Sequence, residues 1–141
     1  MIVVADASVA VKWFLPDSRV EDHADLALAI LEGAVSGRIK LVQPVHFIAE
    51  VAAVLARLKP EEAQDDLLDL IAIERRTADG PEVYATAVEL ATTLRHHLFD
   101  TLYHALALHT TGAMLVTADR RYFNKARHLG QITWLPDFVA A

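Results

Sequence analysis

The chain has 141 residues, 54% of them hydrophobic and 23% charged, and a formal net charge of −6 at pH 7. This composition predicts a single folded domain over residues 1–141, and the acidic balance argues against a protein that coats nucleic acid non-specifically. No apolar run reaches the roughly 20 residues of a membrane span, the N-terminus lacks the basic flank of a signal peptide, and cysteine is absent, so we expect a cytoplasmic protein without thiolate zinc sites.

The first predicted strand is Met1 to Ala5, a continuous apolar run suited to burial on both faces. Asp6-Ala7-Ser8 follows it, and the apolar residues from Val9 to Phe14 indicate a short helix. Asp6 therefore stands at the end of a strand, which is a favourable place for chemistry. The alternative is that Asp6 and Ser8 only cap the turn into the helix.

The next elements lead to a second acidic residue of interest. Helical spacing over Glu21 to Val35 predicts a helix, Ile39 to Val42 a strand, and Val45 to Leu58 another helix. Glu50 lies at the edge of the apolar stripe of that last helix, where a carboxylate is costly unless it is paired, protonated or bound to a metal. We expect no basic partner for it within one helical turn. The alternative is a boundary residue that simply reaches solvent.

The middle of the chain is less informative about function. After Lys59-Pro60, acidic residues interleave with leucines and predict an amphipathic helix with a solvated acidic face. Glu74 to Ala78 is a third strand or a loop, and Asp79-Gly80-Pro81 is a turn signal. Helical spacing returns from Val83 to Leu94.

The most informative stretch contains two further aspartates. Asp100 opens an apolar helix, and Asp119 follows the apolar run Ala113 to Val116, which reads as a buried strand. A helix from Arg120 to His128 and a strand from Ile132 to Leu135 complete the pattern. Each aspartate has the same alternative interpretation, which is that it caps the helix that follows it.

Alternating strands and helices predict a three-layer α/β/α fold around a mainly parallel sheet of roughly five strands. Ligands bind outside the carboxyl ends of such strands, where Asp6 and Asp119 both stand. Together with Glu50 and Asp100 they indicate an acidic pocket, because clustered carboxylates repel one another unless a cation holds them. Oxygen ligands, without a histidine at metal spacing, indicate Mg²⁺ or Mn²⁺.

Four segments resemble the PIN-domain family, and within it the VapC toxins of bacterial toxin–antitoxin pairs. They are Val4-Ala5-Asp6-Ala7-Ser8, Ile48-Ala49-Glu50-Val51, Phe99 to Ala107 and Leu115 to Phe123. The resemblance runs nearly end to end and implies a PIN-like ribonuclease that uses one or two Mg²⁺ ions. One departure is Thr101, where the family more often has alanine.

The resemblance also assigns roles to residues and partners. It implies four catalytic carboxylates, with the metal held by Asp6, Asp100 and Asp119, the acidic helix residue at Glu50, and supporting hydroxyls on Ser8 and Thr117. It further implies a homodimer and a small antitoxin whose tail blocks the site. We expect part of the apolar surface of Val9 to Phe14 and Leu26 to Leu31 to bind that antitoxin.

The chemistry of these residues suits cleavage of an RNA phosphodiester bond. A metal held by carboxylates lowers the pKa of water and neutralises charge on the attacked phosphate, which predicts 5′-phosphate and 3′-hydroxyl product ends. Basic residues at Lys12, Arg120, Arg121 and Lys125 are candidates to hold the RNA backbone, or else form an ordinary solvated face. We expect the histidines not to be catalysts, with His96, His97 and His109 exposed at helix ends. His104, one turn after Asp100, is a candidate hydrogen-bond partner for it.

Other functions fit the sequence less well. Asp6-Ala7-Ser8-Val9-Ala10 resembles the metal-dependent adhesion motif Asp-x-Ser-x-Ser of von Willebrand A-type binding modules, but Ala10 removes one ligand. A haloacid-dehalogenase phosphatase needs a second aspartate where Ser8 stands, and a receiver domain needs an acidic pair and a late lysine. A PIN-like scaffold without catalytic activity remains the alternative, although a scaffold needs none of the four carboxylates.

Overall fold

The computed structural model of the chain describes residues 1–15 and 22–139. At its centre lies a five-stranded sheet with the order β3-β2-β1-β4-β5, and every pairing in it is parallel. The strands are β1 (Ile2–Ala5), β2 (Lys40–Gln43), β3 (Arg76–Thr77), β4 (Ala113–Thr117) and β5 (Ile132–Trp134). All five lie within or next to the segments that the sequence predicts.

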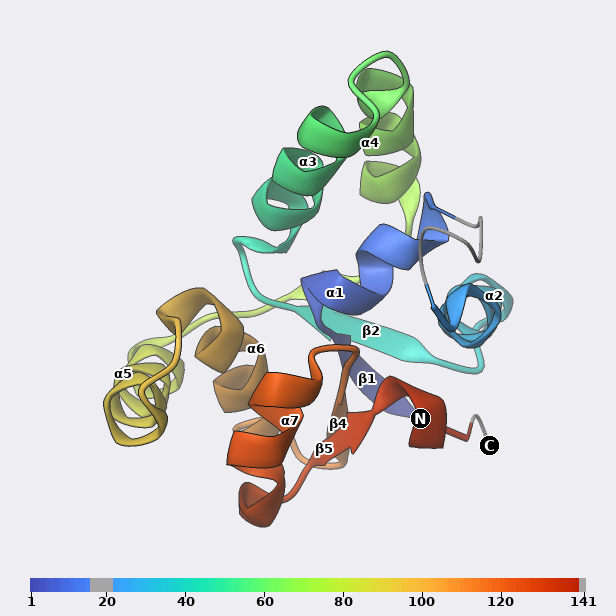
Figure 1. Cartoon of the computed structure of the whole chain (residues 1–141). Coiled ribbons are helices and arrows are strands. Elements are labelled where there is room, and N and C mark those ends of the chain that lie inside the picture. Colours follow the sequence, from blue (N-terminus) through green and yellow to red (C-terminus); the bar gives the residue numbers. More distant parts are fainter. Residues whose placement is uncertain (16–21, 140–141) are drawn as a thin grey trace.

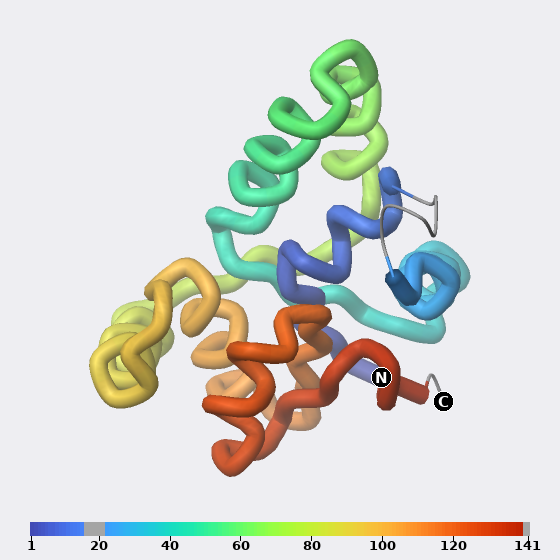
Figure 2. Tube along the Cα trace, viewed as in Figure 1, coloured from blue at the N-terminus to red at the C-terminus, as the bar shows by residue number. Residues whose placement is uncertain are grey.

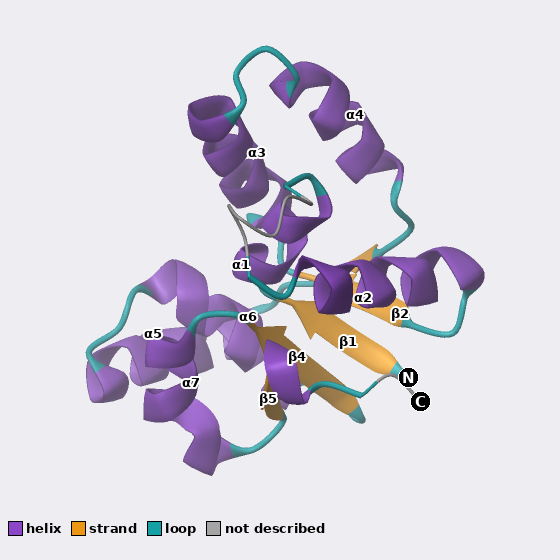
Figure 3. Ribbon diagram, turned by 45° about the vertical axis from the view of Figure 1, so that its right-hand side comes forward, coloured by secondary structure: helices purple, strands orange, loops and turns teal. Residues whose placement is uncertain are grey.

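Helices cover both faces of this sheet. They are α1 (Ala7–Ala10), α2 (Ala24–Ser36), α3 (Phe47–Leu58), α4 (Ala63–Ala72), α5 (Pro81–Leu94), α6 (Leu98–Leu108) and α7 (Arg120–Ala126), with short 3₁₀ turns η1 (Val11–Trp13), η2 (Arg127–Leu129) and η3 (Leu135–Asp137). Figures 1 and 3 show α1 to α4 on one side of the sheet and α5 to α7 on the other. The predicted three-layer α/β/α fold is therefore confirmed.

The remaining differences concern the ends of elements. The second predicted helix begins at Ala24, and Glu21 lies outside the described residues. Figure 2 shows that the α3–α4 pair extends away from the sheet as an arm. Within the described ranges, no helix combines the length and the apolar character that crossing a bilayer requires.

The two central strands form the most deeply buried part of the molecule. Val3, Val4 and Ala5 of β1 and Val116 of β4 are completely buried. Apolar side chains on the inward faces of the helices cover them from both helical layers, and Phe47 of α3 is one of these. This burial on both faces explains why the strands are continuous apolar runs rather than alternating ones.

The carboxyl end of β1 is held from both sides, and by different means. On the β4 side the pairing continues to Ala5 opposite Val116, and the Asp6 amide then donates to the Val116 carbonyl at 3.0 Å. On the β2 side the main-chain pairing stops at Val3 opposite Leu41. The buried amide of Gln43 bridges the gap, since it accepts from the Ala5 amide at 2.7 Å and donates to the Ala5 carbonyl at 2.8 Å.

The order of the strands reverses between β1 and β4. From β1 the chain proceeds to β2 and β3 on one side, then crosses to β4 and β5 on the other. In open α/β sheets, the crevice outside the carboxyl ends at such a reversal is where ligands bind. Asp6 follows β1 and Asp119 follows β4, so both stand at this position.

Candidate metal centre

Asp6 is the most deeply buried acid at this edge of the sheet. It is 7% exposed and caps α1, and its Oδ2 accepts hydrogen bonds from the amide and hydroxyl of Ser8 and, at 3.3 Å, from the Thr117 hydroxyl. The pKa of Asp6 is raised to about 7, mainly by burial and further by the charges of Asp100 and Glu50, while the Ser8 hydrogen bonds oppose the rise. The capping interpretation of Asp6 is thus correct, and the same carboxylate also faces two other acids.

The hydroxyls of Ser8 and Thr117 connect the ends of β1 and β4. The Ser8 hydroxyl donates to Asp6 and accepts from the Ala118 amide at 3.0 Å. The Thr117 hydroxyl donates to Asp6 and accepts from the Asp119 amide at 3.0 Å. Each hydroxyl therefore fixes one aspartate relative to the opposite strand end.

Asp119 is the corresponding residue after β4, and it is more open. It caps α7 by accepting from the Tyr122 amide at 3.1 Å through Oδ1. Its side chain is 35% exposed, and its Oδ2 lies 3.9 Å from His96 Nε2. One oxygen of Asp119 thus serves the helix cap, and the other faces the pocket.

Asp100 lies in the first turn of α6 and meets this group. Its Oδ2 lies 2.8 Å from His96 Nε2. Burial raises the pKa of Asp100, as do the charges of Glu50 and Asp119, while the bond to His96 lowers it. One ligand atom each of His96, Asp100 and Asp119 lie within 4.8 Å of one another, a spacing that would allow all three to surround one ion.

Glu50 approaches the same region from α3. Its Oε1 lies 3.3 Å from His46 Nε2, so the expectation that it has no basic partner within one turn is wrong. His46 Nε2, however, bonds to the Phe99 carbonyl at 2.8 Å, and Oε1 of Glu50 has no hydrogen-bond partner among the described residues. The charges of Glu50 and Asp6 both act on the buried Tyr103, whose pKa is raised mainly by burial and further by these charges. Glu50 and Asp6 therefore both lie close enough to Tyr103 for their charges to act on it.

Two expectations about histidines are wrong. His104 is fully buried and contacts the Tyr122 hydroxyl at 2.9 Å and the Gly130 carbonyl at 2.8 Å rather than Asp100. The partner of Asp100 is His96, whose side chain is only 8% exposed although we expected it at the surface. His97 and His109 are exposed as expected. The signal available in the sequence was a histidine four residues before each of Glu50 and Asp100.

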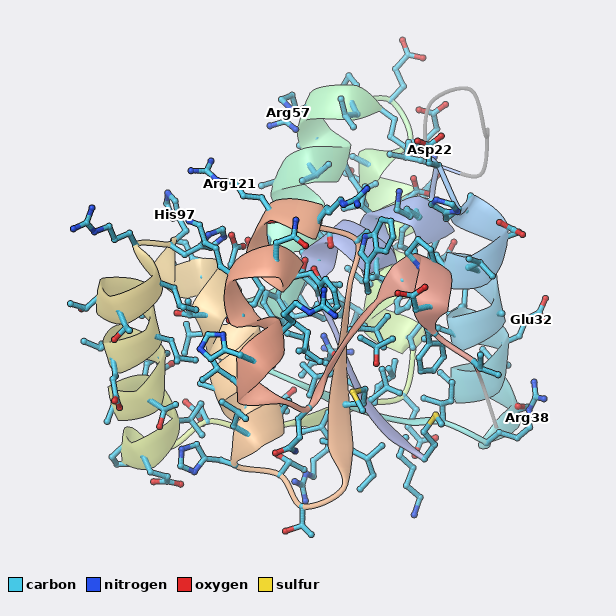
Figure 4. All side chains as sticks on the ribbon, turned by 60° about the horizontal axis from the view of Figure 1, so that its bottom comes forward. Asp22, Glu32, Arg38, Arg57, His97 and Arg121 are labelled. Carbon is cyan, nitrogen blue, oxygen red and sulfur yellow. The ribbon has the colours of Figure 1, made fainter. Side chains whose placement is uncertain are left out.

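The open side of the acidic group forms a pocket of about 540 Å³. It is lined by Ala91, Arg95, His96, His97, Asp100, Asp119 and Arg121. Figure 4 shows the His97 and Arg121 side chains pointing to the same side of the molecule. A larger hollow of about 870 Å³ lies at the amino ends of the strands, where Glu74 is the one acid among its lining residues. The clustered carboxylates make the smaller pocket the candidate site.

The four predicted RNA contacts differ in exposure. Lys12 is 7% exposed, so it lacks the exposure that contact with an RNA backbone requires. Arg120 and Arg121 are exposed, with the Arg120 guanidinium 4.9 Å above the Trp134 ring. Lys125 faces inward, since its Nζ lies 3.0 Å from the Arg95 carbonyl and 3.2 Å from His96 Nδ1. Of these four basic residues, Arg121 lines the pocket, and Arg120 is exposed beside Trp134.

The residues of this site fit a divalent cation. The charges of Asp100 and Glu50 raise the pKa of Asp6, and those of Glu50 and Asp119 raise the pKa of Asp100, which is the repulsion that a bound cation relieves. The described donors to Asp6 all reach Oδ2, and Glu50 Oε1 is a buried oxygen without a hydrogen bond. Carboxylate oxygens in this number are ligands that Mg²⁺ or Mn²⁺ accepts.

Comparison with known proteins gives one family and two similar solved structures. The family model for the PIN domain matches residues 3–129. The structure is similar to VapBC2 from Rickettsia felis bound to a DNA fragment from its promoter, with 18% identity, a TM-score of 0.62 and coverage of 95% of this chain and 97% of that chain. It is also similar to VapBC-1 from nontypeable Haemophilus influenzae, with 15% identity, a TM-score of 0.63 and coverage of 95% and 96%. The comparison with curated proteins found no match.

Proposed function

The chain belongs to the PIN-domain family, and from that premise we propose that residues 1–141 act as one domain, a divalent-metal-dependent endoribonuclease of the cytoplasm. The observation that carries the proposal is the grouping of Asp6, Glu50, Asp100 and Asp119, in which burial and mutual charge raise the pKa of two members. Asp6, Asp100 and Asp119 would hold Mg²⁺ or Mn²⁺. When bound, the cation lowers the pKa of water and offsets the charge on the attacked phosphate.

Each residue has a distinct task in this proposal. Ser8 and Thr117 hold Oδ2 of Asp6 in place, which leaves its Oδ1 to face a cation. Glu50 Oε1 receives no hydrogen bond from the described residues, so it is able to accept a proton from the attacking water. Arg121, which lines the pocket, and the exposed Arg120 next to it in the chain would contact phosphates beside the scissile bond.

We further propose that the protein is the toxin of a toxin–antitoxin pair and forms a homodimer. The fold it shares with the two VapBC structures supports an antitoxin partner. The apolar residues of Val9–Phe14 and Leu26–Leu31 that we expected to receive it are buried or half-buried. Several large apolar side chains are exposed on different elements, and three of them lie together on the α3–α4 arm at Leu58, Leu68 and Ile71, which are 51%, 66% and 49% exposed. This arm is the better candidate for a partner contact.

The test is cleavage of total RNA by the purified protein, with mapping of the fragment ends. We expect 5′-phosphate and 3′-hydroxyl ends, loss of activity in EDTA, and recovery when Mg²⁺ or Mn²⁺ is restored. Asp6→Asn should be inactive, whereas Glu74→Gln, which removes an acid at the opposite end of the strands, should remain active. Cyclic phosphate ends or full activity in EDTA would contradict the proposal and transfer the reaction to the histidines.

A further inference from the structure

His96 occupies a position in the acidic group that neither the sequence pattern nor the family resemblance assigns. Its side chain is 8% exposed, and its Nε2 lies 2.8 Å from Asp100 Oδ2. On the far side of the ring, Nδ1 lies 3.2 Å from Lys125 Nζ. The ring also packs edge-on against the Tyr122 ring, with 4.8 Å between centroids. Both nitrogens and the ring plane are therefore fixed by neighbours.

The neighbours of His96 determine which nitrogen carries the proton. A lysine ammonium has only donors, so His96 Nδ1 must accept from Lys125. In a neutral imidazole the other nitrogen then carries the hydrogen, and Nε2 donates it to the Asp100 carboxylate. Lys125 is itself anchored by a 3.0 Å bond to the Arg95 carbonyl, which lies between α5 and α6.

This tautomer has a consequence for the metal. His96 Nε2 lies as close to the acids as a ligand would, but a nitrogen that carries hydrogen has no lone pair to give to a cation. A neutral histidine with Nε2 free would add a nitrogen ligand, and nitrogen shifts preference from Mg²⁺ toward Zn²⁺, Co²⁺ and Ni²⁺. Holding the hydrogen on Nε2 keeps the site an oxygen site.

We propose that Lys125 fixes the tautomer of His96, so that His96 positions Asp100 as a hydrogen-bond donor and is kept from binding the cation. Lys125 and His96 are then positioning residues that determine which metal the site accepts. The inference rests on the divalent-cation site of the proposed function, and deepens it by naming the residues that set its selectivity.

The first experiment reads the tautomer directly. Long-range ¹H–¹⁵N spectra of the whole protein, labelled with ¹⁵N-histidine and free of metal, distinguish hydrogen on Nε2 from hydrogen on Nδ1. We expect His96 to carry it on Nε2, and Lys125→Met to shift the population toward Nδ1. Lys125→Arg, which keeps a donor, should restore the wild-type spectrum. A wild-type His96 with its hydrogen on Nδ1, or on both nitrogens, would overturn the proposal.

The second experiment reads metal selectivity without RNA. Calorimetric titration with Mg²⁺ and with Zn²⁺ should show that Lys125→Met binds Zn²⁺ at least about tenfold more tightly, with a much smaller change for Mg²⁺. Adding His96→Gln to Lys125→Met should remove the gain. Arg57→Met, an exposed change on α3, is the matched control and should behave as wild type. Unchanged Zn²⁺ affinity in a folded Lys125→Met protein would contradict the proposal.

The two proposals fail in different ways. RNA cleavage does not enter either readout, so an inactive protein with the expected tautomer and selectivity would refute the ribonuclease proposal and leave this inference intact. An active, EDTA-sensitive enzyme whose His96 binds the metal through Nε2 would refute the inference alone. Adding Zn²⁺ to the wild type tests for this second case. If the His96 Nε2 signal then moves to the chemical shift of a metal-bound nitrogen, His96 is a ligand.

Discussion

Asp6 and Asp119 occupy equivalent places in the chain and differ in what surrounds them. Each follows one of two adjacent parallel strands, and each accepts a backbone hydrogen bond as the cap of the next helix. Asp6 is 7% exposed, whereas the Asp119 side chain is 35% exposed. The same local pattern thus produces one buried carboxylate and one open carboxylate.

The packing of the following helix causes the difference. The short α1 after Asp6 contacts β4 and α3, so it lies inside the molecule. The helix α7 after Asp119 contacts β5, the edge strand, and leaves its start open toward the pocket. A buried acid costs stability and holds a cation rigidly, while an open acid costs little and can meet substrate. The comparison therefore predicts different consequences for changes at the two strand ends.

The largest expected effect comes from replacing Asp6 or Asp119 by asparagine, which removes the carboxylate charge and keeps the helix cap. Asp6→Asn and Asp119→Asn should both reduce RNA cleavage to background, since both remove a proposed metal ligand. Asparagine caps a helix as well as aspartate does, so capping is preserved. Asp6→Asn should stabilise the metal-free protein at pH 8 by up to roughly 4 kcal/mol, because the wild-type pKa rises from 3.8 to about 7 on folding. Asp119→Asn should change stability by about 0.5 kcal/mol or less.

Urea unfolding of the two variants and the wild type measures this contrast. A stabilised Asp6→Asn protein that has lost cleavage separates the loss of function from loss of the fold. Equal stability changes in the two variants would contradict the distinction between the buried and the open strand end.

The second effect is the pH dependence of stability in the metal-free protein. The folded state keeps a proton on Asp6 up to about pH 7, whereas the unfolded state releases it near 3.8. Between these values the folded state binds more protons, so this group makes the free energy of unfolding decrease as pH rises, with no further change from it above about 7. Unfolding curves from pH 4 to 8 should show the decrease in the wild type, and Asp6→Asn should reduce it. An unchanged slope in Asp6→Asn would assign the decrease to other groups.

The third effect concerns the hydroxyl that joins the two strand ends. Ser8→Ala removes a donor to Asp6 and leaves the Ala118 amide without its acceptor. We expect cleavage to decrease about 10- to 100-fold and the affinity for Mn²⁺ to decrease with it. Ser36→Ala, a serine change on α2 away from the site, is the control. Wild-type metal affinity in Ser8→Ala would show that the hydroxyl does not fix the ligand.

The smallest effect is expected on the open rim alone. Arg121→Ala should raise the KM for RNA several-fold with little change in kcat, and should reduce the slope of log KM against log salt by about one. Arg38 is exposed and does not line the pocket beside the acids, so Arg38→Ala is the control. A large decrease in kcat in Arg121→Ala would place that side chain in the reaction rather than in RNA contact.

The fold and the strand-end positions of Asp6 and Asp119 were predictable because each depends on local pattern. Apolar runs identified β1 and β4, and the carboxyl ends of adjacent strands must meet at one edge, so Asp6 and Asp119 followed from sequence. The proposed role of His96 did not follow from the sequence, because His96 lies in the turn after α5. That turn depends on Arg95, which adopts φ 51°. A glycine at this position would have signalled the turn. His104 is one turn from Asp100, but its face of α6 packs into the core. The burial of Lys12 was missed for a similar reason, since α1 and the 3₁₀ turn η1 that contains Lys12 are too short to show a periodicity from which burial can be read.

Gln43 illustrates how geometry alone can restrict a position. Its side-chain amide replaces main-chain strand pairing beside Ala5, the residue before Asp6. It accepts a hydrogen bond from the Ala5 amide and donates one to the Ala5 carbonyl. Glutamate has the same length but cannot donate, leucine and methionine can do neither, and asparagine is shorter by one methylene. Each replacement leaves a buried Ala5 group unbonded. An uncharged residue that binds no ligand is therefore among the least replaceable in the chain, and a mutational scan read for activity alone would mistake it for part of the catalytic machinery.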